Sequence, residues 1–226
     1  MINIGPYHLD LYEGNTGVCV SGGADSAVLL YILMANTKHH LHVYTFISPE
    51  RREAIEYHVD AVVDTCSKLT GNTNYTYHKE YVDSQLPDLM INLFKSKFEN
   101  DDIGMLYLGL TKFPPKEVWQ CFDQQQPEWH TEFRDDTIVH PLYGMILPTI
   151  SELFDPTVTE LSIDNRVYKP FVNLNKKDIA AMYHILGIED QLFKLTRSCE
   201  TPEHIGSHCG VCWWCDERKW AFGYLE

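Results

Sequence analysis

Apolar runs and stretches with helical spacing alternate along the first half of the chain. Three apolar runs predict strands, at 17–20, 41–47 and 103–110, and the alternating stretch 74–81 predicts another. Three stretches between them repeat apolar residues every three or four positions and predict helices, at 24–35, 50–70 and 86–98. Because strands that alternate with helices form parallel sheets, the sequence predicts an α/β fold whose parallel sheet carries helices on both faces.

The second half of the chain is less regular. From 111 to 165 the periodicity dissolves among prolines, aromatic residues and acidic residues. This stretch predicts a functional insertion or lid, with an acidic surface excursion as the alternative. Order returns with a strand end at 166–171, a helix over 175–186 and a short helix at 189–194. Near the N-terminus, the loose alternation of 7–12 predicts an edge strand.

The turn between the first strand and the first helix has an unusual composition. It contains Ser21, Gly22 and Gly23, followed by Asp25 and Ser26 at the start of the helix. Glycines let the backbone approach a ligand closely, and the first turn of a helix has unpaired N–H groups that favour an anion. The turn therefore predicts a phosphate site; a turn with glycine for geometry only is the alternative. It lacks the lysine of a Walker A loop, so a P-loop kinase or GTPase is excluded.

Charge and hydropathy limit the classes of partner. The 226 residues include 18 basic and 32 acidic ones, a net charge of −14, and no basic run. A polynucleotide substrate is not expected, because nucleic-acid binding needs a positive surface. No stretch has the apolar length of a membrane span, and the N-terminus lacks a signal-peptide pattern. We therefore expect a cytoplasmic protein without membrane contact.

Seven cysteines are present, and four of them gather near the C-terminus. These four form what we call the cysteine cluster: Cys199, Cys209, Cys212 and Cys215. Four thiols at this spacing predict a structural Cys₄ zinc site. An iron–sulfur cluster is the alternative, and unbound thiols are a third reading. His204 and His208 lie inside the loop and are expected to be solvated rather than to replace a cysteine. Each of the other three cysteines, Cys19, Cys66 and Cys121, is predicted to be a reduced structural thiol.

Two sets of motifs resemble a known enzyme family. The turn at 21–26 resembles the PP-loop ATP pyrophosphatases, which cleave ATP between its α- and β-phosphates and adenylate a carboxylate or carbonyl oxygen. Near the C-terminus the chain is similar to the 7-cyano-7-deazaguanine synthases within that superfamily. The similar motifs are the segment from Pro170 to Lys176, then Thr196-Arg197-Ser198-Cys199, then Cys209-Gly210-x-Cys212-x-x-Cys215-x-x-Arg218. This resemblance implies a PP-loop α/β domain at 1–195 and a zinc-binding segment at 196–226 packed on it.

The resemblance also implies an activity. It implies an ATP-dependent ligase that converts 7-carboxy-7-deazaguanine and ammonia to the nitrile, or to the amide, through an adenylated intermediate, using ATP, Mg²⁺ and a structural Zn²⁺. Asp25 would help to ligate Mg²⁺, and Lys176 would balance phosphate charge; a surface lysine at a helix start is the alternative for Lys176. A homodimer is a family expectation. Ser21, Gly22, Gly23, Asp25 and Ser26 would hold pyrophosphate.

Residues after the second strand are assigned more loosely. Phe46 and Ile47 would flank adenine, or else are ordinary sheet residues. Arg51 and Arg52 would balance phosphate charge, with a solvated helix face as the favoured alternative. The chain also departs from the family after its second and fourth strands, where the family's motifs are replaced, including the motif after the fourth strand that contacts the deazaguanine. A nucleotide-binding protein without catalysis, and an amidoligase for another small carboxylate, are therefore the alternative functions.

Overall fold

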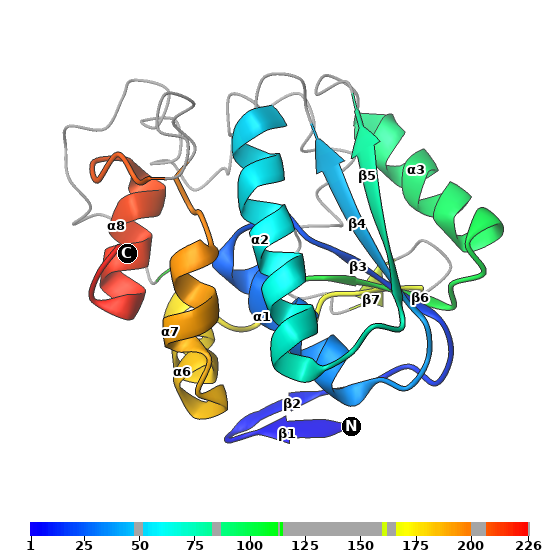
Figure 1. Ribbon diagram of the computed structural model, residues 1–226, viewed down its shortest axis with the longest axis horizontal. Coiled ribbons are helices and arrows are strands. Elements are labelled where there is room, and N and C mark those ends of the chain that lie inside the picture. Colours follow the sequence, from blue (N-terminus) through cyan, green and yellow to red (C-terminus); the bar gives the residue numbers. More distant parts are fainter. Residues whose placement is uncertain are drawn as a thin grey trace.

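The computed structural model describes residues 1–47, 52–82, 87–112, 114, 160–161, 166–199 and 207–225. A six-stranded sheet in the order β5-β4-β3-β6-β8-β7 forms its centre (Figure 1). The strands are β3 (Thr16–Cys19), β4 (Leu41–Ile47), β5 (Tyr75–Tyr81), β6 (Met105–Leu108), β7 (Glu160–Leu161) and β8 (Val167–Tyr168). All neighbours pair in parallel except β7, which is antiparallel to β8. The predicted parallel α/β sheet is confirmed.

The strand order creates a switch point at the centre of the sheet. From β3 the chain moves outward through β4 to β5, and then returns to place β6 on the other side of β3. The order of the strands therefore reverses beside β3. Ligands of open α/β sheets bind in the crevice at such a point. The Ser-Gly-Gly loop (residues 21–23) follows β3 at this edge.

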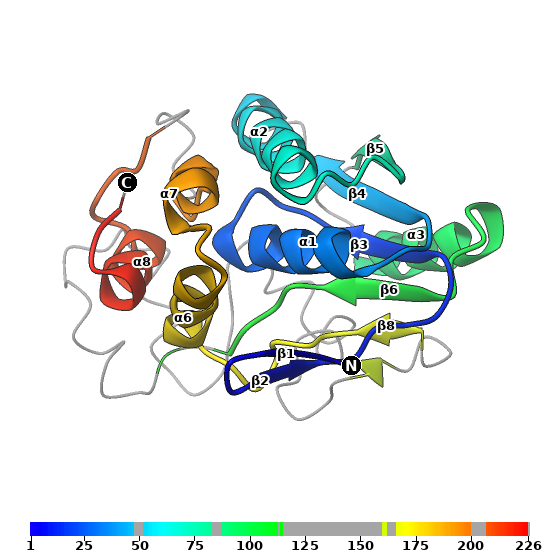
Figure 2. The same cartoon turned by 60° about the horizontal axis from the view of Figure 1, so that its bottom comes forward.

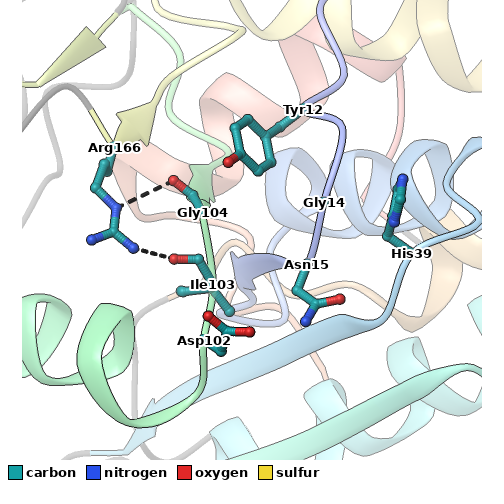
Figure 3. A pocket seen from close by; sticks show the side chains of 8 residues that line it. All are labelled: Tyr12, Gly14, Asn15, His39, Asp102, Ile103, Gly104 and Arg166. Carbon is teal, nitrogen blue, oxygen red and sulfur yellow. Dashed lines mark hydrogen bonds between the residues drawn. The ribbon is translucent and has the colours of Figure 1, made fainter.

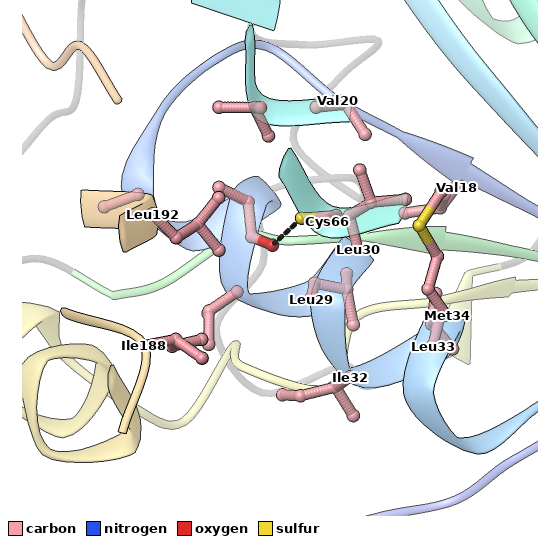
Figure 4. Close-up of a cluster of buried hydrophobic side chains, with 14 of the residues drawn as sticks. Val18, Val20, Leu29, Leu30, Ile32, Leu33, Met34, Cys66, Ile188 and Leu192 are labelled. Atoms are coloured by element: carbon pink, nitrogen blue, oxygen red, sulfur yellow. Dashed lines mark hydrogen bonds between the residues drawn. The ribbon is translucent and has the colours of Figure 1, made fainter. Parts of the chain in front are cut away.

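Helices cover both faces of the sheet. α1 (Ala24–Asn36) and α2 (Arg52–Thr70) pack on one face, and α3 (Pro87–Asn100) packs on the other (Figure 2). The apolar residues of α1 are buried on nearly all sides, because the helix lies between the sheet, α2 and the C-terminal helices. Figure 4 shows this core, in which the thiol of Cys66 on α2 donates to the carbonyl of Ala27 on α1 at 3.8 Å.

The C-terminal helices lie beside the start of α1 (Figures 1 and 2). They are α6 (Lys176–Leu186), α7 (Glu189–Leu192) with the following 3₁₀ turn η3 (Phe193–Leu195), and α8 (Trp213–Phe222). The sequence predicted the first two helices but not α8. The buried residues of α8 are Cys215, Glu217 and Arg218, so its inward face carries no apolar stripe for a pattern to detect.

Part of the stretch at 7–12 forms a strand, as expected, but this strand lies in a separate hairpin. β2 (Tyr7–Leu9) pairs with β1 (Ile2–Ile4) in an antiparallel hairpin, and neither joins the six-stranded sheet in the described structure. The hairpin lies against α6, where the hydroxyl of Tyr7 donates to Asp178 Oδ1 at 3.1 Å. Most of the predicted insertion at 111–165 lies outside the described residues.

None of the helices in the described residues combines the length and apolar character needed to span a bilayer.

Candidate nucleotide site and metal centre

Internal hydrogen bonds hold the Ser-Gly-Gly loop in place. Ser26 Oγ accepts from the backbone N–H of Ser21 at 3.2 Å and donates to the carbonyl of Gly23 at 3.1 Å. Gly22 adopts φ +82°, and a Cβ there would lie 3.1 Å from Cβ of His58, so glycine is required for both conformation and space. The two serines therefore organise the backbone of the loop, beyond the ligand contacts that the sequence suggested for them.

The start of α1 is open to an anion. Gly23 is the N-cap residue, and no side chain caps this end of the helix. The backbone N–H groups of the first turn are therefore available to an external acceptor, and the helix dipole adds positive potential at the same place. Asp25 is the acidic residue of this first turn. The predicted phosphate-binding residues thus share one short segment at the switch point.

The segment after β6 closes against the same helix start. A Cβ at Gly109 would lie 2.9 Å from three backbone atoms of α1, including the nitrogen of Ser26. Thr111 Oγ1 donates to Asp25 Oδ2 at 3.1 Å. Glycine at 109 is thus the condition for the close approach of the two chain segments. The sequence predicted a strand that ends at 110, but it gave Thr111 no contact.

A buried group of charges, the charged cluster, lies beside the loop and consists of Asp25, Lys176 and Glu217. Lys176 Nζ is 2.6 Å from Asp25 Oδ2 and 3.8 Å from Glu217 Oε2. Lys176 is 9% exposed, so the alternative of a surface lysine is wrong. The two residues predicted to be catalytic, which are 151 positions apart, form a direct ion pair.

The position of Lys176 is unfavourable for helix formation alone. It is the first residue of α6, where a capping box between Asn175 and Asp178 fixes the helix start. A cation at a helix N-terminus opposes the helix dipole, and burial adds a desolvation cost. The two carboxylates of the charged cluster offset both costs. The arrangement places a fixed ammonium group beside the loop.

Burial and mutual attraction set the protonation of this cluster. Burial acts to lower the pKa of Lys176, but Asp25 and Glu217 outweigh it, and the pKa ends above its ordinary value. Burial raises the pKa of Glu217 to about 7, while the nearby Lys176 acts in the opposite direction. Asp25 Oδ1 is buried and has no hydrogen-bond partner within the described part of the chain. A buried carboxylate oxygen of this kind fits a cation such as Mg²⁺.

Arg218 ties the C-terminal helix to the segment before the cysteine cluster. Its guanidinium donates to the carbonyls of Phe193 and Leu225 and to Thr196 Oγ1, at 2.9, 2.7 and 2.9 Å. The guanidinium also lies 3.6 Å from the centre of the Phe193 ring. Arg218 is 1% exposed. Arg218 therefore positions α8, because its guanidinium N–H groups donate to acceptors of the neighbouring chain segments.

The segment after η3 touches the Ser-Gly-Gly loop directly. The backbone N–H of Arg197 donates to the carbonyl of Gly22 at 2.8 Å. On the other side, His58 of α2 contacts the carbonyl of Leu195 through Nδ1 at 2.8 Å. Burial lowers the pKa of His58, and the charges of Arg197 and Arg218 act in the same direction. His58 thus connects α2 to the segment leading to the cysteine cluster, and its lowered pKa favours the neutral imidazole.

The cysteine cluster has the spacing of a metal site. The ligand atoms of all four residues lie within 4.8 Å of one another. Cys215 Sγ is 3.4 Å from Cys212 Sγ and 3.8 Å from Cys209 Sγ. Four sulfurs around a tetrahedral zinc ion, with Zn–S near 2.3 Å, are about 3.8 Å apart, so the four thiols fit zinc. His208 Nε2 instead accepts from the N–H of Ser198 at 3.4 Å.

The remaining predicted residues occupy different environments. Phe46 is half-buried against Phe94 of α3, with ring centres 5.8 Å apart, and Ile47 is fully buried with its carbonyl accepting from the N–H of Val82. Their contact with adenine stays a prediction. Arg51 and the side chain of Arg52 lie outside the described residues, as do Cys121 and His204.

Cys19 and Cys66, which with the cysteine cluster make up the cysteines of the described residues, are sheltered in the way expected of structural thiols. Burial raises the pKa of Cys19 and of Cys66 well above the ordinary value of a thiol.

A pocket of about 380 Å³ lies at the opposite, amino-terminal ends of β3 and β6 (Figure 3). Its lining consists of Tyr12, Gly14, Asn15, His39, Asp102, Ile103, Gly104 and Arg166. Arg166 donates to the carbonyls of Ile103 and Gly104, so its guanidinium holds the chain before β6. None of the predicted site residues lines this pocket.

Sequence reasoning missed Glu217. It stands next to Arg218, which the family pattern includes, but a single glutamate two residues after a cysteine carries no distinguishing signal. Only the burial of α8 against α6 brings its carboxylate to Lys176.

The comparisons with known proteins give a partial match. The model of the family described as "Queuosine biosynthesis protein QueC" matches residues 153–226. This range contains α6, α7, α8, the cysteine cluster and two members of the charged cluster, but not the Ser-Gly-Gly loop. No curated protein matches the chain. The match to residues 153–226 supports placing the chain, as a divergent member, in the 7-cyano-7-deazaguanine synthase family that its motifs predicted.

Proposed function

We propose that the protein is an ATP-dependent ligase that converts a 7-deazaguanine carboxylate and ammonia to the corresponding nitrile. The observation that carries the proposal is the meeting of the Ser-Gly-Gly loop, Asp25 and Lys176 at the switch point of the sheet. The partial match to a queuosine biosynthesis family supports the class of substrate. The prediction that Asp25 and Lys176 act together rests on their 2.6 Å ion pair.

The first step is an adenylation. A carboxylate oxygen of the substrate attacks the α-phosphorus of ATP, the bond to the β-phosphate oxygen breaks, and pyrophosphate leaves. The N–H groups of the loop and of the first turn of α1 would bind the pyrophosphate oxygens, and the ammonium of Lys176 would offset their charge. Mg²⁺, when bound, neutralises further phosphate charge, and the unpaired Oδ1 of Asp25 is the oxygen in the described structure that fits it.

The second step forms the C–N bond. Ammonia attacks the activated carbonyl carbon, AMP leaves with the electron pair of the C–O bond, and a proton is lost to give an amide. A second ATP adenylates the amide oxygen, and loss of AMP and two protons gives the nitrile. Positioning and charge neutralisation supply the catalysis, so no cysteine or histidine nucleophile is needed.

The zinc site would have a structural role. Four thiolates fill a tetrahedral zinc ion and leave no position for substrate. The ion would hold residues 199 and 209–215 together, and so would fix the start of α8, which carries Glu217 and Arg218. The reaction itself would take place around Lys176 of α6, which contacts Glu217 of α8.

Product analysis by mass spectrometry tests the proposal. The purified protein is incubated with ATP, Mg²⁺, ammonium and 7-carboxy-7-deazaguanine, and we expect AMP, pyrophosphate and the nitrile. Asp25→Asn keeps the shape of the side chain but loses its charge, and AMP formation should fall about 100-fold or more. Asp64→Asn removes an exposed carboxylate of α2 and is the matched control. Amide as the end product would restrict the reaction to its first half, and no AMP with this acid would refute the proposed substrate.

A further inference from the structure

Two histidines and an aspartate meet far from the candidate nucleotide site. His42 on β4 and His78 on β5 bring Nδ1 and Nε2 within 3.0 Å of each other. Asp101 follows the end of α3, and its carboxylate joins them, so that the ligand atoms of the three residues lie within 4.8 Å of one another. We call His42, His78 and Asp101 the histidine cluster. All three side chains are half-buried, so an ion in solution can reach them.

The fold explains why these three residues converge. In the parallel pairing of β4 and β5, Tyr44 is opposite His78, and side chains alternate between the faces of a strand. His42, Tyr44 and His78 therefore share the face that α3 covers. α3 runs back toward the amino-terminal ends of the strands, and its last turn delivers Asp101 to the same place. The histidine cluster lies at the opposite edge of the sheet from the Ser-Gly-Gly loop.

A neighbouring hydroxyl orients the carboxylate. Tyr44 donates to Asp101 Oδ2 at 2.7 Å, and the ring of Tyr44 stacks on that of His78 with centres 4.8 Å apart. Hydrogen bonds of this kind to a carboxylate fix its position around metal ions, and the second carboxylate oxygen is then left to bind. Tyr44 is fully buried, so packing around its ring holds the hydroxyl beside Asp101.

The local charge also favours a cation. Lys97 has its Nζ 5.5 Å from the centre of the Tyr44 ring, and it forms an ion pair with Glu80. Asp101 brings a carboxylate to the two imidazoles, and the hydroxyl of Tyr44 donates to it. The two imidazole nitrogens at 3.0 Å cannot both carry protons that point at each other. Neutral imidazole is the form that binds metal ions.

We propose that His42, His78 and Asp101 form a second metal site, for a divalent first-row transition metal ion such as zinc. Two imidazoles and one carboxylate suit this class of ion, whereas magnesium and calcium prefer oxygen ligands alone. Three protein ligands leave at least one position of a tetrahedral ion open, unlike the four thiols of the cysteine cluster. The 3.0 Å between the two imidazole nitrogens is close to the 3.3 Å or so expected between ligands about 2.0 Å from one ion, and the carboxylate, within 4.8 Å of both, would move closer on binding. The site does not depend on the proposed ligase reaction.

The competing interpretation is a stack of aromatic rings that only fills space. His42 and His78 are nearly parallel, at 15° and with centres 5.3 Å apart, and Tyr44 continues the stack. In that case substitutions would change stability without any effect of metal. Cobalt separates the two interpretations and also separates the two metal sites, because cobalt bound to thiolates gives an intense charge-transfer absorption that cobalt bound to histidine and carboxylate lacks.

The experiment titrates the full-length protein, as purified, with Co²⁺ and with Zn²⁺, and measures bound metal together with the visible and near-ultraviolet spectrum. We expect one equivalent of Co²⁺ that binds without a thiolate band. Asp101→Asn keeps an acceptor for Tyr44 and should weaken this binding about 100-fold or more, because it removes a ligand charge. His78→Gln should abolish it, and the melting temperature without added metal shows whether each variant is folded.

His184→Gln is the matched control, because His184 is an exposed histidine of α6 outside the histidine cluster. It should leave unchanged the equivalent of Co²⁺ that binds without a thiolate band. The proposal would be overturned if this equivalent of Co²⁺ still bound to both Asp101→Asn and His78→Gln. It would also be overturned if the only cobalt bound by the wild-type protein showed the thiolate band.

Discussion

Removal of the buried ammonium of Lys176 should destabilise the protein strongly. Lys176→Met keeps most of the volume of the side chain but leaves Asp25 and Glu217 as two buried carboxylates without their common partner. The side chains of Lys176 and Glu217 are 11% and 4% exposed, so solvent screens this loss only weakly.

The distances set the scale of the effect. At an effective dielectric constant near 20, a pair of unit charges separated by 2.6 Å attracts by about 6 kcal/mol, and one separated by 3.8 Å by about 4 kcal/mol. Part of this lost attraction is offset, because the substitution also removes the free-energy cost of burying the charge of Lys176. Loss of one partner of a buried ion pair typically costs about 3–5 kcal/mol, and we expect Lys176→Met to lower the free energy of unfolding by this amount. For a chain of this length that is a drop of roughly 6–20 °C in melting temperature.

A double-mutant cycle isolates the interaction with Glu217. Glu217→Gln alone should cost about 1 kcal/mol, because Lys176 keeps its shorter contact with Asp25. In the Lys176→Met background the same change removes an uncompensated carboxylate, so it should restore about 1–3 kcal/mol. Urea unfolding, followed by the fluorescence of the α8 tryptophans, measures all four proteins above the Glu217 pKa of about 7.

The control for this cycle is the next residue along α6. Lys177 is exposed, and its ammonium lies 4.8 Å from the centre of the Trp220 ring. Lys177→Met should therefore cost no more than about 1 kcal/mol. Equal losses in Lys176→Met and Lys177→Met, or strict additivity in the cycle, would refute the reasoning that these buried charges hold α6 and α8 to the start of α1.

Three further predictions concern the loop, the cysteine cluster and the pH dependence of stability. Gly109→Ala should cost about 1–3 kcal/mol and weaken ATP binding measured by calorimetry, because its Cβ would lie 2.9 Å from backbone atoms of Ser26; unchanged affinity would contradict the close approach. Cys212→Ser should lower both the zinc content and the melting temperature, whereas Cys19→Ser, outside the cluster, should keep its zinc. His58 has a lowered pKa, so below its ordinary value of 6.5 the unfolded chain binds more protons and stability falls as the pH falls. His58→Gln should make this fall in melting temperature shallower, and parallel pH curves for the two proteins would argue against it.

The order of elements in the first half of the chain was predictable because burial there follows simple patterns. The strand predicted at 41–47 matches β4, and the helix predicted at 24–35 ends one residue short of α1. Both are apolar elements between polar turns, so sequence and burial agree. The strand predicted at 103–110 is shorter in the structure, because Gly109 leaves the sheet to pass the start of α1.

The candidate site was predictable where one residue type carries the chemistry. Four closely spaced cysteines and a Ser-Gly-Gly turn can be recognised from the sequence alone, and the structure brings the members of each group together. Glu217 and Thr111 are ordinary residue types whose importance lies in three-dimensional contacts with Lys176 and Asp25. No local pattern encodes such contacts, since they depend on how α8 and the end of β6 pack on α1.

The contacts of α8 also bear on the division of the chain into a nucleotide-binding domain and a zinc segment at residue 196. Cys215 and Glu217 are two residues apart on one helix, and the second reaches Lys176 on α6. Arg218 then binds Phe193 and Thr196 on either side of the predicted boundary. A metal ion that fixes the start of α8 would therefore also fix the carboxylate beside the phosphate site. On this argument α8 completes the charged cluster from outside the sheet, and a metal ion held by the cysteine cluster would support the predicted phosphate site through this helix.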